Sequence, residues 1–181
     1  MKRLTRRERS RISGFTLIEV LIAVLITTVG LLGIAKMQAL AISSTKGAGD
    51  RSLLALQVGS LVSAMHANKA FWNSTFVPTA VLAQGTTITD ATNQLTTPVT
   101  DCSTAPCEVA DMAALDFQNW VAGMNQQFPT YAAKIDCTNS VPVSCEIYVT
   151  FKENTISISK STAAPTASQT QTQSFSVFVK P

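Results

Sequence analysis

The chain is poor in the side chains that most often carry catalysis. It has one histidine among 181 residues, and charged residues make up only 14% of it. It contains no HExxH, GxSxG, GxxxxGK[ST] or GxGxxG pattern, the common signatures of zinc peptidases, serine hydrolases and nucleotide-binding enzymes. Asp111 and Asp116 stand five positions apart on a predicted helix, so they point to different faces and form no catalytic carboxylate pair. We therefore expect no enzyme activity, no cofactor and no metal site.

Proline is absent from the start of the chain up to Pro78. Residues 15–35 contain one charged side chain, Glu19, and at about 1.5 Å per residue they make a helix roughly 30 Å long, enough to cross a bilayer. Apolar residues then recur at helical spacing, at Leu54, Val58, Leu61 and Met65. This pattern predicts that the helix continues as an amphipathic half over residues 36–70.

Positive charge is concentrated ahead of the apolar segment. Residues 1–13 hold six of the 14 Lys and Arg and one of the 11 Asp and Glu, a net charge of +5, which leaves −2 for the rest. Basic residues on one side of an apolar helix predict that this arm is cytoplasmic and that the remainder lies outside. The exported part has no basic cluster, so we do not expect nucleic acid as a partner.

Glu19 is anomalous for its surroundings. A carboxylate at the membrane centre costs about 2.5–3.5 kcal/mol, less near the interface, and a helix N-terminus offsets at most about 1 kcal/mol. A cut before Phe15 would free an α-amine with a reference pKa of about 8, four residues from Glu19 on the same helix face. That amine could pair with Glu19 of its own chain or of a neighbour, and pairing with a neighbour would drive assembly.

Residues 14–20 (GFTLIEV), with the basic arm before them and the apolar helix after them, resemble the type III signal of type IV prepilins and pseudopilins. The resemblance implies that prepilin peptidase cleaves after Gly14 and N-methylates Phe15, and that Glu19 and Thr16 act in assembly. It also implies a cleaved leader (1–14), a transmembrane and filament-core helix (15–35), and an inner-membrane protein that later enters a pilus. Two alternatives are a single-pass anchor with a stray Glu and a secretory signal peptide cut after Ala41.

A second resemblance concerns residues 29–38 (VGLLGIAKMQ), which look like the GLLGLA-x-x-Q segment of the PilV minor pilins, also called type IV pilus modification proteins. Residues 61–68 resemble the end of that group's long helix. This implies a low-copy pilin whose partners are other minor pilins, the major pilin and the inner-membrane assembly platform. The alternatives are a type II secretion minor pseudopilin and a pilus-tip head that binds a surface or DNA.

All four cysteines follow the apolar helix, and an even number in an exported segment predicts two disulfides. Of the three connectivities we prefer the local pairs, Cys102–Cys107 and Cys137–Cys145. A zinc site is the alternative, but these spacings fit no common zinc ribbon or finger.

The expected fold class is α+β and type IV pilin-like, with the long helix packed against a small head over residues 71–181. In this head we predict a loop over 71–107, with a short strand near 86–89, then a helix over 108–127 and an antiparallel sheet over 133–181. Alternation from Cys145 onward predicts the first strand of the C-terminal part. We expect a turn at Glu153-Asn154, a second strand from Ile156 and a last strand around Phe175 to Val179.

Overall fold

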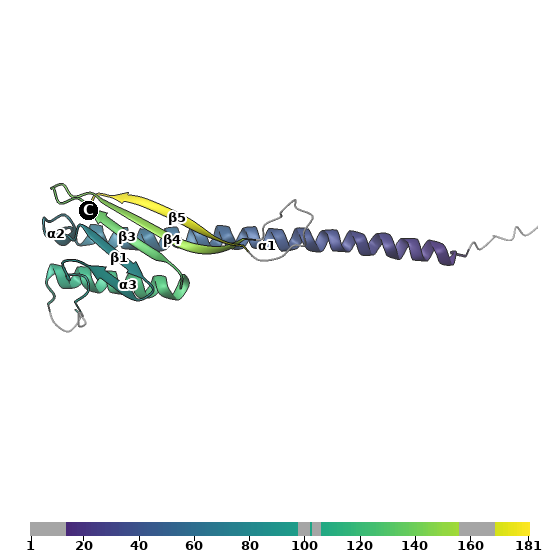
Figure 1. Ribbon diagram of the computed structural model, residues 1–181, viewed down its shortest axis with the longest axis horizontal. Coiled ribbons are helices and arrows are strands. Elements are labelled where there is room, and N and C mark those ends of the chain that lie inside the picture. Colours follow the sequence, from purple (N-terminus) through teal and green to yellow (C-terminus); the bar gives the residue numbers. More distant parts are fainter. Residues whose placement is uncertain (1–13, 98–101, 103–105, 156–168) are drawn as a thin grey trace, which may run out of the picture. The chain divides into compact units, whose positions relative to one another are not determined.

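The computed structural model describes residues 14–97, 102, 106–155 and 169–181 (Figure 1). Residues 1–13 of the predicted leader (1–14) and the strand start predicted at Ile156 lie outside these residues. The chain divides into two compact units, with the boundary between Ile42 and Ser43. Helix α1 (Leu17–Ala67) contributes to both units, and each unit is described by itself below.

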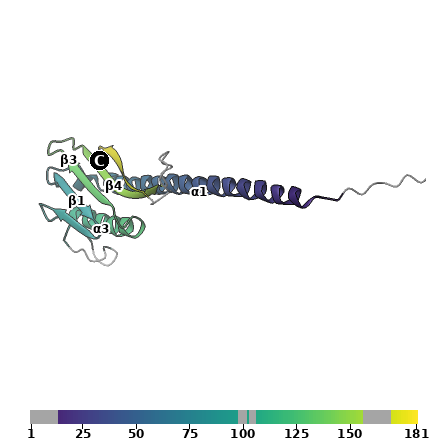
Figure 2. The same ribbon diagram turned by 45° about the vertical axis from the view of Figure 1, so that its right-hand side comes forward.

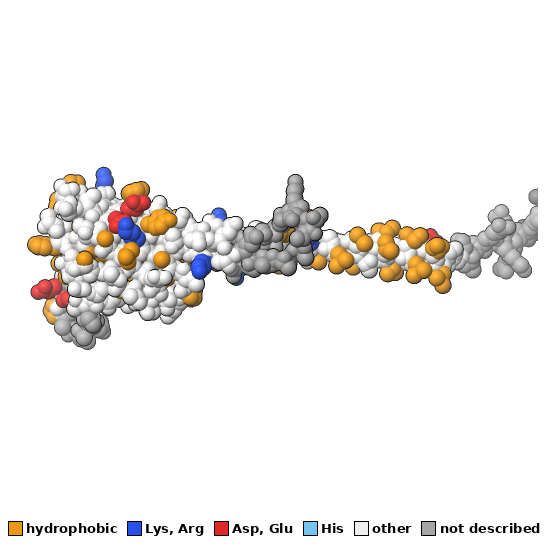
Figure 3. Space-filling view, in the orientation of Figure 1, with side chains coloured by type: hydrophobic (Ala, Val, Ile, Leu, Met, Phe, Trp, Pro, Cys, Tyr) orange, Lys and Arg blue, Asp and Glu red, His pale blue; other side chains and the backbone are white. Residues whose placement is uncertain are grey.

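The first unit is the N-terminal part of α1. The helix begins directly after Thr16, whose carbonyl accepts hydrogen bonds from the backbone N–H groups of Glu19 and Val20 at 3.1 and 3.4 Å. The large apolar side chains between Phe15 and Ile34 are 52–83% exposed, and Figure 3 shows them along the helix. The described part of this unit, residues 14–42, therefore has no buried core, as expected for a helix that is covered by lipid or by other helices.

In the second unit α1 is amphipathic, as predicted. The four residues of the predicted stripe, Leu54, Val58, Leu61 and Met65, are at most 2% exposed. After Asn68 a single helical turn, α2 (Lys69–Trp72), buries the side chains of Phe71 and Trp72. The Asn68 amide donates to Val109 O at 2.7 Å, which ties the end of α1 to the start of the next long helix.

That next helix, α3 (Val109–Gln127), confirms the helix predicted over 108–127. It begins after Glu108, whose N–H donates to Asp111 Oδ2 at 3.3 Å. In Figures 1 and 2 α3 lies beside the second half of α1, and Trp120 Nε1 donates to Gln57 O at 2.8 Å.

The sheet has five strands in the order β2-β1-β3-β4-β5, and all neighbours are antiparallel. The strands are β1 (Ala80–Gln84), β2 (Thr87–Asp90), β3 (Ala132–Cys137), β4 (Cys145–Thr155) and β5 (Gln169–Val179). One face of the sheet carries alternate apolar side chains, such as Ile135 and Ile147, that are fully buried in the core with α1 and α3. The α+β fold with a long N-terminal helix and an antiparallel head is therefore as predicted.

Both preferred disulfides are present. Cys102 and Cys107 have Cα atoms 5.4 Å apart, and Cys137 and Cys145 have Cα atoms 4.0 Å apart. The second pair joins directly opposite positions on β3 and β4, so it closes the hairpin between these strands.

The predicted loop over 71–107 is wrong in its first half. Strand β2 corresponds to the short strand expected near 86–89, but β1 was not predicted, and it lies inside the sheet between β2 and β3. Val81 and Ala83 face the core while Leu82, the largest apolar residue of β1, is 48% exposed, which hides the alternation in the sequence. Gly85, at φ +58°, permits the tight turn from β1 to β2.

The turn predicted at Glu153-Asn154 is also wrong. Strand β4 continues to Thr155, and Glu153 pairs with Gln171 of β5. Glu153 occupies an inward-facing position, is only 7% exposed, and accepts a hydrogen bond from Arg51 Nη2 of α1 at 3.1 Å. Because α1 supplies this partner, the charge does not end the strand.

Candidate functional site

The candidate site lies in the apolar stretch of α1, where few side chains are polar. Residues 17–35 contain only three of them, Glu19, Thr27 and Thr28. The Thr27 hydroxyl donates to Ala23 O or Val24 O, at 3.0 and 2.9 Å, and the Thr28 hydroxyl donates to Leu25 O at 2.8 Å. Both hydroxyls are thus satisfied by carbonyls of their own helix and need no external partner in an apolar environment.

Glu19 differs from the two threonines. It lies in the first turn of α1, its side chain is exposed, and it forms no ion pair with any residue that the structure describes. The helix N-terminus favours a carboxylate there by about 0.3–1 kcal/mol, less than the cost of placing a carboxylate in hydrocarbon. Glu19 is therefore the polar group of this segment that still requires a partner.

The predicted site residues lie next to one another at the start of α1. Gly14, Phe15 and Thr16 precede the helix in an exposed, non-helical segment, and Thr16 caps it through its carbonyl. Phe15 and Glu19 lie on one side of the chain, on which Ala23 and Thr27 follow at four-residue spacing.

The described part of the head offers no comparable cluster. No group of three His, Cys, Asp or Glu side chains able to hold a metal ion occurs among the described residues. A shallow hollow of about 330 Å³ lies between β2 and α3, and it is lined by Thr86, Ile88, Thr96, Gln118, Val121 and Ala122, none of which is acidic or basic. Gln118 Nε2 already donates to Leu95 O and Thr97 O at 3.1 and 2.8 Å.

Two ionisable groups of the head have altered pKa values, and burial is the cause of both shifts. Burial raises the pKa of Asp116, a half-buried residue of α3, above its ordinary value. Burial also raises the pKa of Tyr131 to about 12, and its hydroxyl donates to Gly85 O at 3.0 Å, beneath the β1–β2 turn. A protonated Tyr131 thus holds the turn to the core.

Sequence reasoning missed the pairing of Arg51 with Glu153. A Cβ atom built on Gly47 of α1 would overlap Glu153 Oε1, so the carboxylate reaches the helix where a side chain is lacking. The sequence did hold a sign of this pairing, because Glu153 is the next alternate position after Cys145, Ile147, Val149 and Phe151. A charged residue in an inward-facing series indicates a buried partner.

Comparison with known proteins supports the importance of the N-terminal segment. Residues 9–35 match the family model described as the prokaryotic N-terminal methylation motif, a range that includes Gly14, Phe15, Thr16 and Glu19. No curated protein and no solved structure matches the chain. The described residues contain one helix, α1, that is long and apolar enough to cross a membrane, and it lies near the N-terminus. The chain therefore carries the processing signal of a type IV prepilin-like protein at the start of an α+β, pilin-like fold.

Proposed function

We propose that the protein is a minor type IV pilin, a structural subunit of the pilus or of the complex that initiates it. Prepilin peptidase hydrolyses the Gly14–Phe15 peptide bond and methylates the new Phe15 amine. The methylated amine keeps its basicity, so it is cationic at neutral pH. Residues 29–38 support the finer assignment, because they resemble the PilV group.

The observation that carries this proposal is that Glu19 forms no ion pair with any described residue, whereas the two threonines of the segment are both satisfied within the helix. In a bundle of such helices the Phe15 amine of one subunit can approach Glu19 of its neighbour. Both charges then lie in a medium of low dielectric constant, where an ion pair is much stronger than in water. Thr16 belongs to the same contact, since it fixes the first turn that carries Glu19.

The rest of the apolar segment supports the same function. Its large side chains are exposed over the whole helix surface, which suits two environments, a bilayer and a bundle of similar helices. The net charge of +5 in residues 1–13 favours an inner-membrane orientation with the N-terminus in the cytoplasm and the head in the periplasm. The partners are then prepilin peptidase, the assembly platform, the major pilin and other minor pilins, and we assign no enzyme activity to the chain.

The test replaces Glu19 with Gln, which removes the charge and keeps the shape. We expect normal cleavage and methylation, read from the intact mass of the mature chain, and at least a tenfold loss of the protein from sheared pili. Thr28→Val is the matched control, since it also removes a polar group from the segment, but one whose hydrogen bond lies within the helix. Equal incorporation of the Glu19→Gln and wild-type chains would refute the assembly role.

The same preparation separates the alternatives. Recovery of the wild-type protein with a secretion pseudopilus rather than with pili would identify a type II secretion minor pseudopilin. A mature chain that still begins at Met1, or begins after Ala41, would exclude both assignments.

A further inference from the structure

Strand β5 is long and forms one edge of the sheet, with no further strand beside it among the described residues. It spans 11 residues, all in continuous register with β4, and is drawn in yellow in Figure 1. Residues 169–179 contain no charged residue, no proline and no glycine. Natural edge strands are usually shortened, bulged or charged, because a regular free edge is a template for another strand.

The opposite edge of the sheet is protected in the usual way. Strand β2 has only four residues and ends at Asp90, whose carboxylate accepts hydrogen bonds from Thr92 N, Thr92 Oγ1 and Leu95 N at 2.8–3.0 Å. These bonds turn the chain away directly after the strand. The two edges therefore differ, and only β5 provides a long pairing surface.

Hydrogen bonds at the far end of the hairpin fix which backbone groups of β5 point outward. Cys137 N–H donates to Thr79 O, on the β1 side, and Thr138 N–H donates to Ser144 O, on the β4 side, at 3.0 and 2.9 Å. In β3, the backbone N–H and C=O groups of odd-numbered residues therefore point toward β1, and those of even-numbered residues point toward β4. Through the register of β3 with β4, the odd-numbered residues of β4 direct their backbone N–H and C=O groups toward β5. Through the register of β4 with β5, the odd-numbered residues of β5 direct theirs toward β4.

The outward backbone groups of β5 therefore belong to its even-numbered residues. Thr172, Ser174, Ser176 and Phe178 each direct one N–H and one C=O away from the sheet, and their side chains are exposed. Among the described residues none forms a backbone hydrogen bond with these groups outside the ladder with β4.

The core is also incompletely covered at this edge. Phe175 and Val177 face inward but are only half-buried, whereas their partners on β4, Val149 and Ile147, have no exposed surface. Phe178 on the outer face is 75% exposed. One more strand would cover Phe175 and Val177 and pair the outward N–H and C=O groups.

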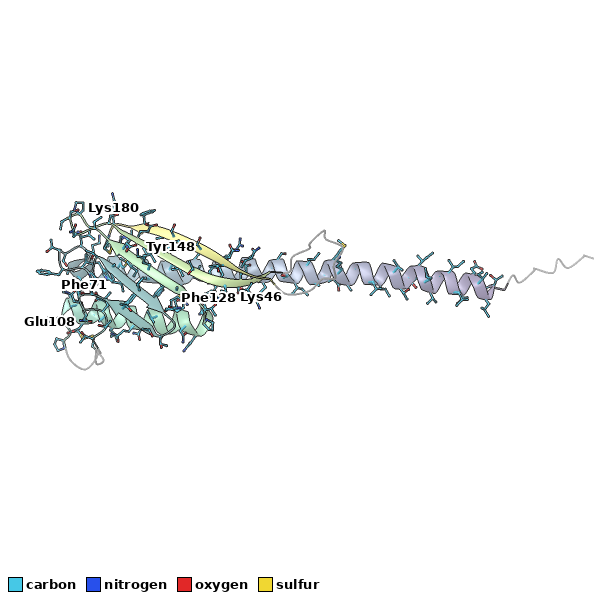
Figure 4. All side chains as sticks on the ribbon, viewed as in Figure 1. Lys46, Phe71, Glu108, Phe128, Tyr148 and Lys180 are labelled. Atoms are coloured by element: carbon cyan, nitrogen blue, oxygen red, sulfur yellow. A yellow bond between two sulfur atoms is a disulfide. The ribbon has the colours of Figure 1, made fainter. Side chains whose placement is uncertain are left out.

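We propose that β5 receives an extended segment of a different subunit, added as a sixth strand to the sheet. The segment has apolar side chains at alternate positions, to cover Phe175 and Val177. It carries at least one carboxylate on its other face, to meet Lys152, which is exposed opposite Thr172. Toward the other end of β5 the outer face holds both charges, Glu146 opposite Phe178 and the exposed Lys180, labelled in Figure 4.

A second copy of this chain, paired antiparallel through its own β5, does not suit the edge. Val143 N–H, just before β4, donates to Asn73 Oδ1 after α2, and β4 ends near Arg51, so β4 runs back along α1. Strand β5 consequently runs in the same direction as residues 43–67 of α1. Antiparallel pairing of two β5 strands would make these segments of the two copies run in opposite directions, although both chains leave the same membrane before residue 43.

The test uses Ser176→Pro, which removes one outward N–H that no described residue accepts, with Ser176→Ala as a control that keeps it. Proline is tolerated at the free side of an edge strand, so the mature chain should fold in detergent micelles with unchanged tryptophan fluorescence. We expect at least a tenfold loss of Ser176→Pro from sheared pili and wild-type incorporation of Ser176→Ala. Equal incorporation of the two variants overturns the proposal.

A second measurement decides the question if Ser176→Pro does not accumulate. A photo-crosslinking phenylalanine analogue replaces Phe178 in the otherwise wild-type chain, and replaces Asn119, exposed on α3, in the control. We expect an adduct only from position 178, mapped by mass spectrometry to an extended segment of another subunit. An adduct with a second copy, or none in the membrane and pilus fractions, overturns the proposal. The Glu19 variants test a separate contact, so failure of one proposal leaves the other measurable.

Discussion

Replacing Gly47 by alanine should destabilise the head, although alanine is the better helix former. In an exposed helix interior, replacing glycine by alanine stabilises the helix by about 1 kcal/mol. The new methyl group would, however, displace Glu153 Oε1, and the carboxylate would lose Arg51 while remaining 93% buried. Leaving a buried polar group without its partner costs about 1–3 kcal/mol, more for a charged one. We expect a net loss of about 0–2 kcal/mol for Gly47→Ala.

Gly49→Ala is the matched control, because a Cβ atom there meets nothing within 4 Å and the two glycines share one helix. It should stabilise the head by about 1 kcal/mol. In a Glu153→Ala background, where the obstruction is gone, Gly47→Ala should become stabilising by a similar amount, and this change of sign is the central expectation.

The assay is urea unfolding of the mature chain in non-ionic micelles, followed by tryptophan fluorescence. Trp72 and Trp120 are 2% and 6% exposed and both belong to the second unit, so the signal reports the head. If Gly47→Ala stabilises the otherwise wild-type head as much as Gly49→Ala does, then Glu153 is not held against α1 and the reasoning is wrong.

Two further predictions concern the ionisable groups of the head. Because burial raises the pKa of Asp116, its folded form holds a proton more tightly than the unfolded chain, and stability is lost as pH rises through the folded pKa. Asp116→Asn should therefore stabilise the head at neutral pH, with a gain that fades as the pH falls toward the ordinary value of 3.8, and urea unfolding at both pH values checks this. Tyr131→Phe should cost about 0.5–1.5 kcal/mol at neutral pH through the lost bond to Gly85. Since the pKa of Tyr131 rises from 10.0 to about 12 on folding, the free energy of unfolding of the wild-type head should fall above pH 10. If the Tyr131→Phe variant loses as much stability above pH 10, ionisation of Tyr131 is not the cause.

The features predicted correctly from the sequence are those set by neighbouring residues. The long helix follows from a proline-free apolar and then amphipathic run, and α3 from its apolar spacing. The assembly role of Glu19, the only charged residue among residues 15–35, stays a prediction. The Cys137–Cys145 pair spans eight positions, so a hairpin brings its ends together.

The features that were missed depend on contacts between distant parts of the chain. Strand β1 is held between β2 and β3, so a five-residue segment with an exposed Leu82 becomes interior strand only in that context. Strand β4 passes through Glu153 because α1 offers Arg51 about a hundred positions earlier. The outward groups of β5 follow from registers across three strands, which no local pattern in residues 169–179 encodes.

The hydroxyls of Thr27 and Thr28 have a consequence for how a subunit moves. Their hydrogen bonds to the carbonyls of Leu25 and of Ala23 or Val24 lie within the helix. The helix can therefore move from lipid into a bundle of other helices without breaking these bonds. Most of the surface of this apolar segment can therefore contact lipid acyl chains or apolar side chains of other helices equally well. Under the function proposed above, the transfer is reversible and fast along most of the apolar segment, and pairing of the Glu19 carboxylate sets the position at which the helix stops.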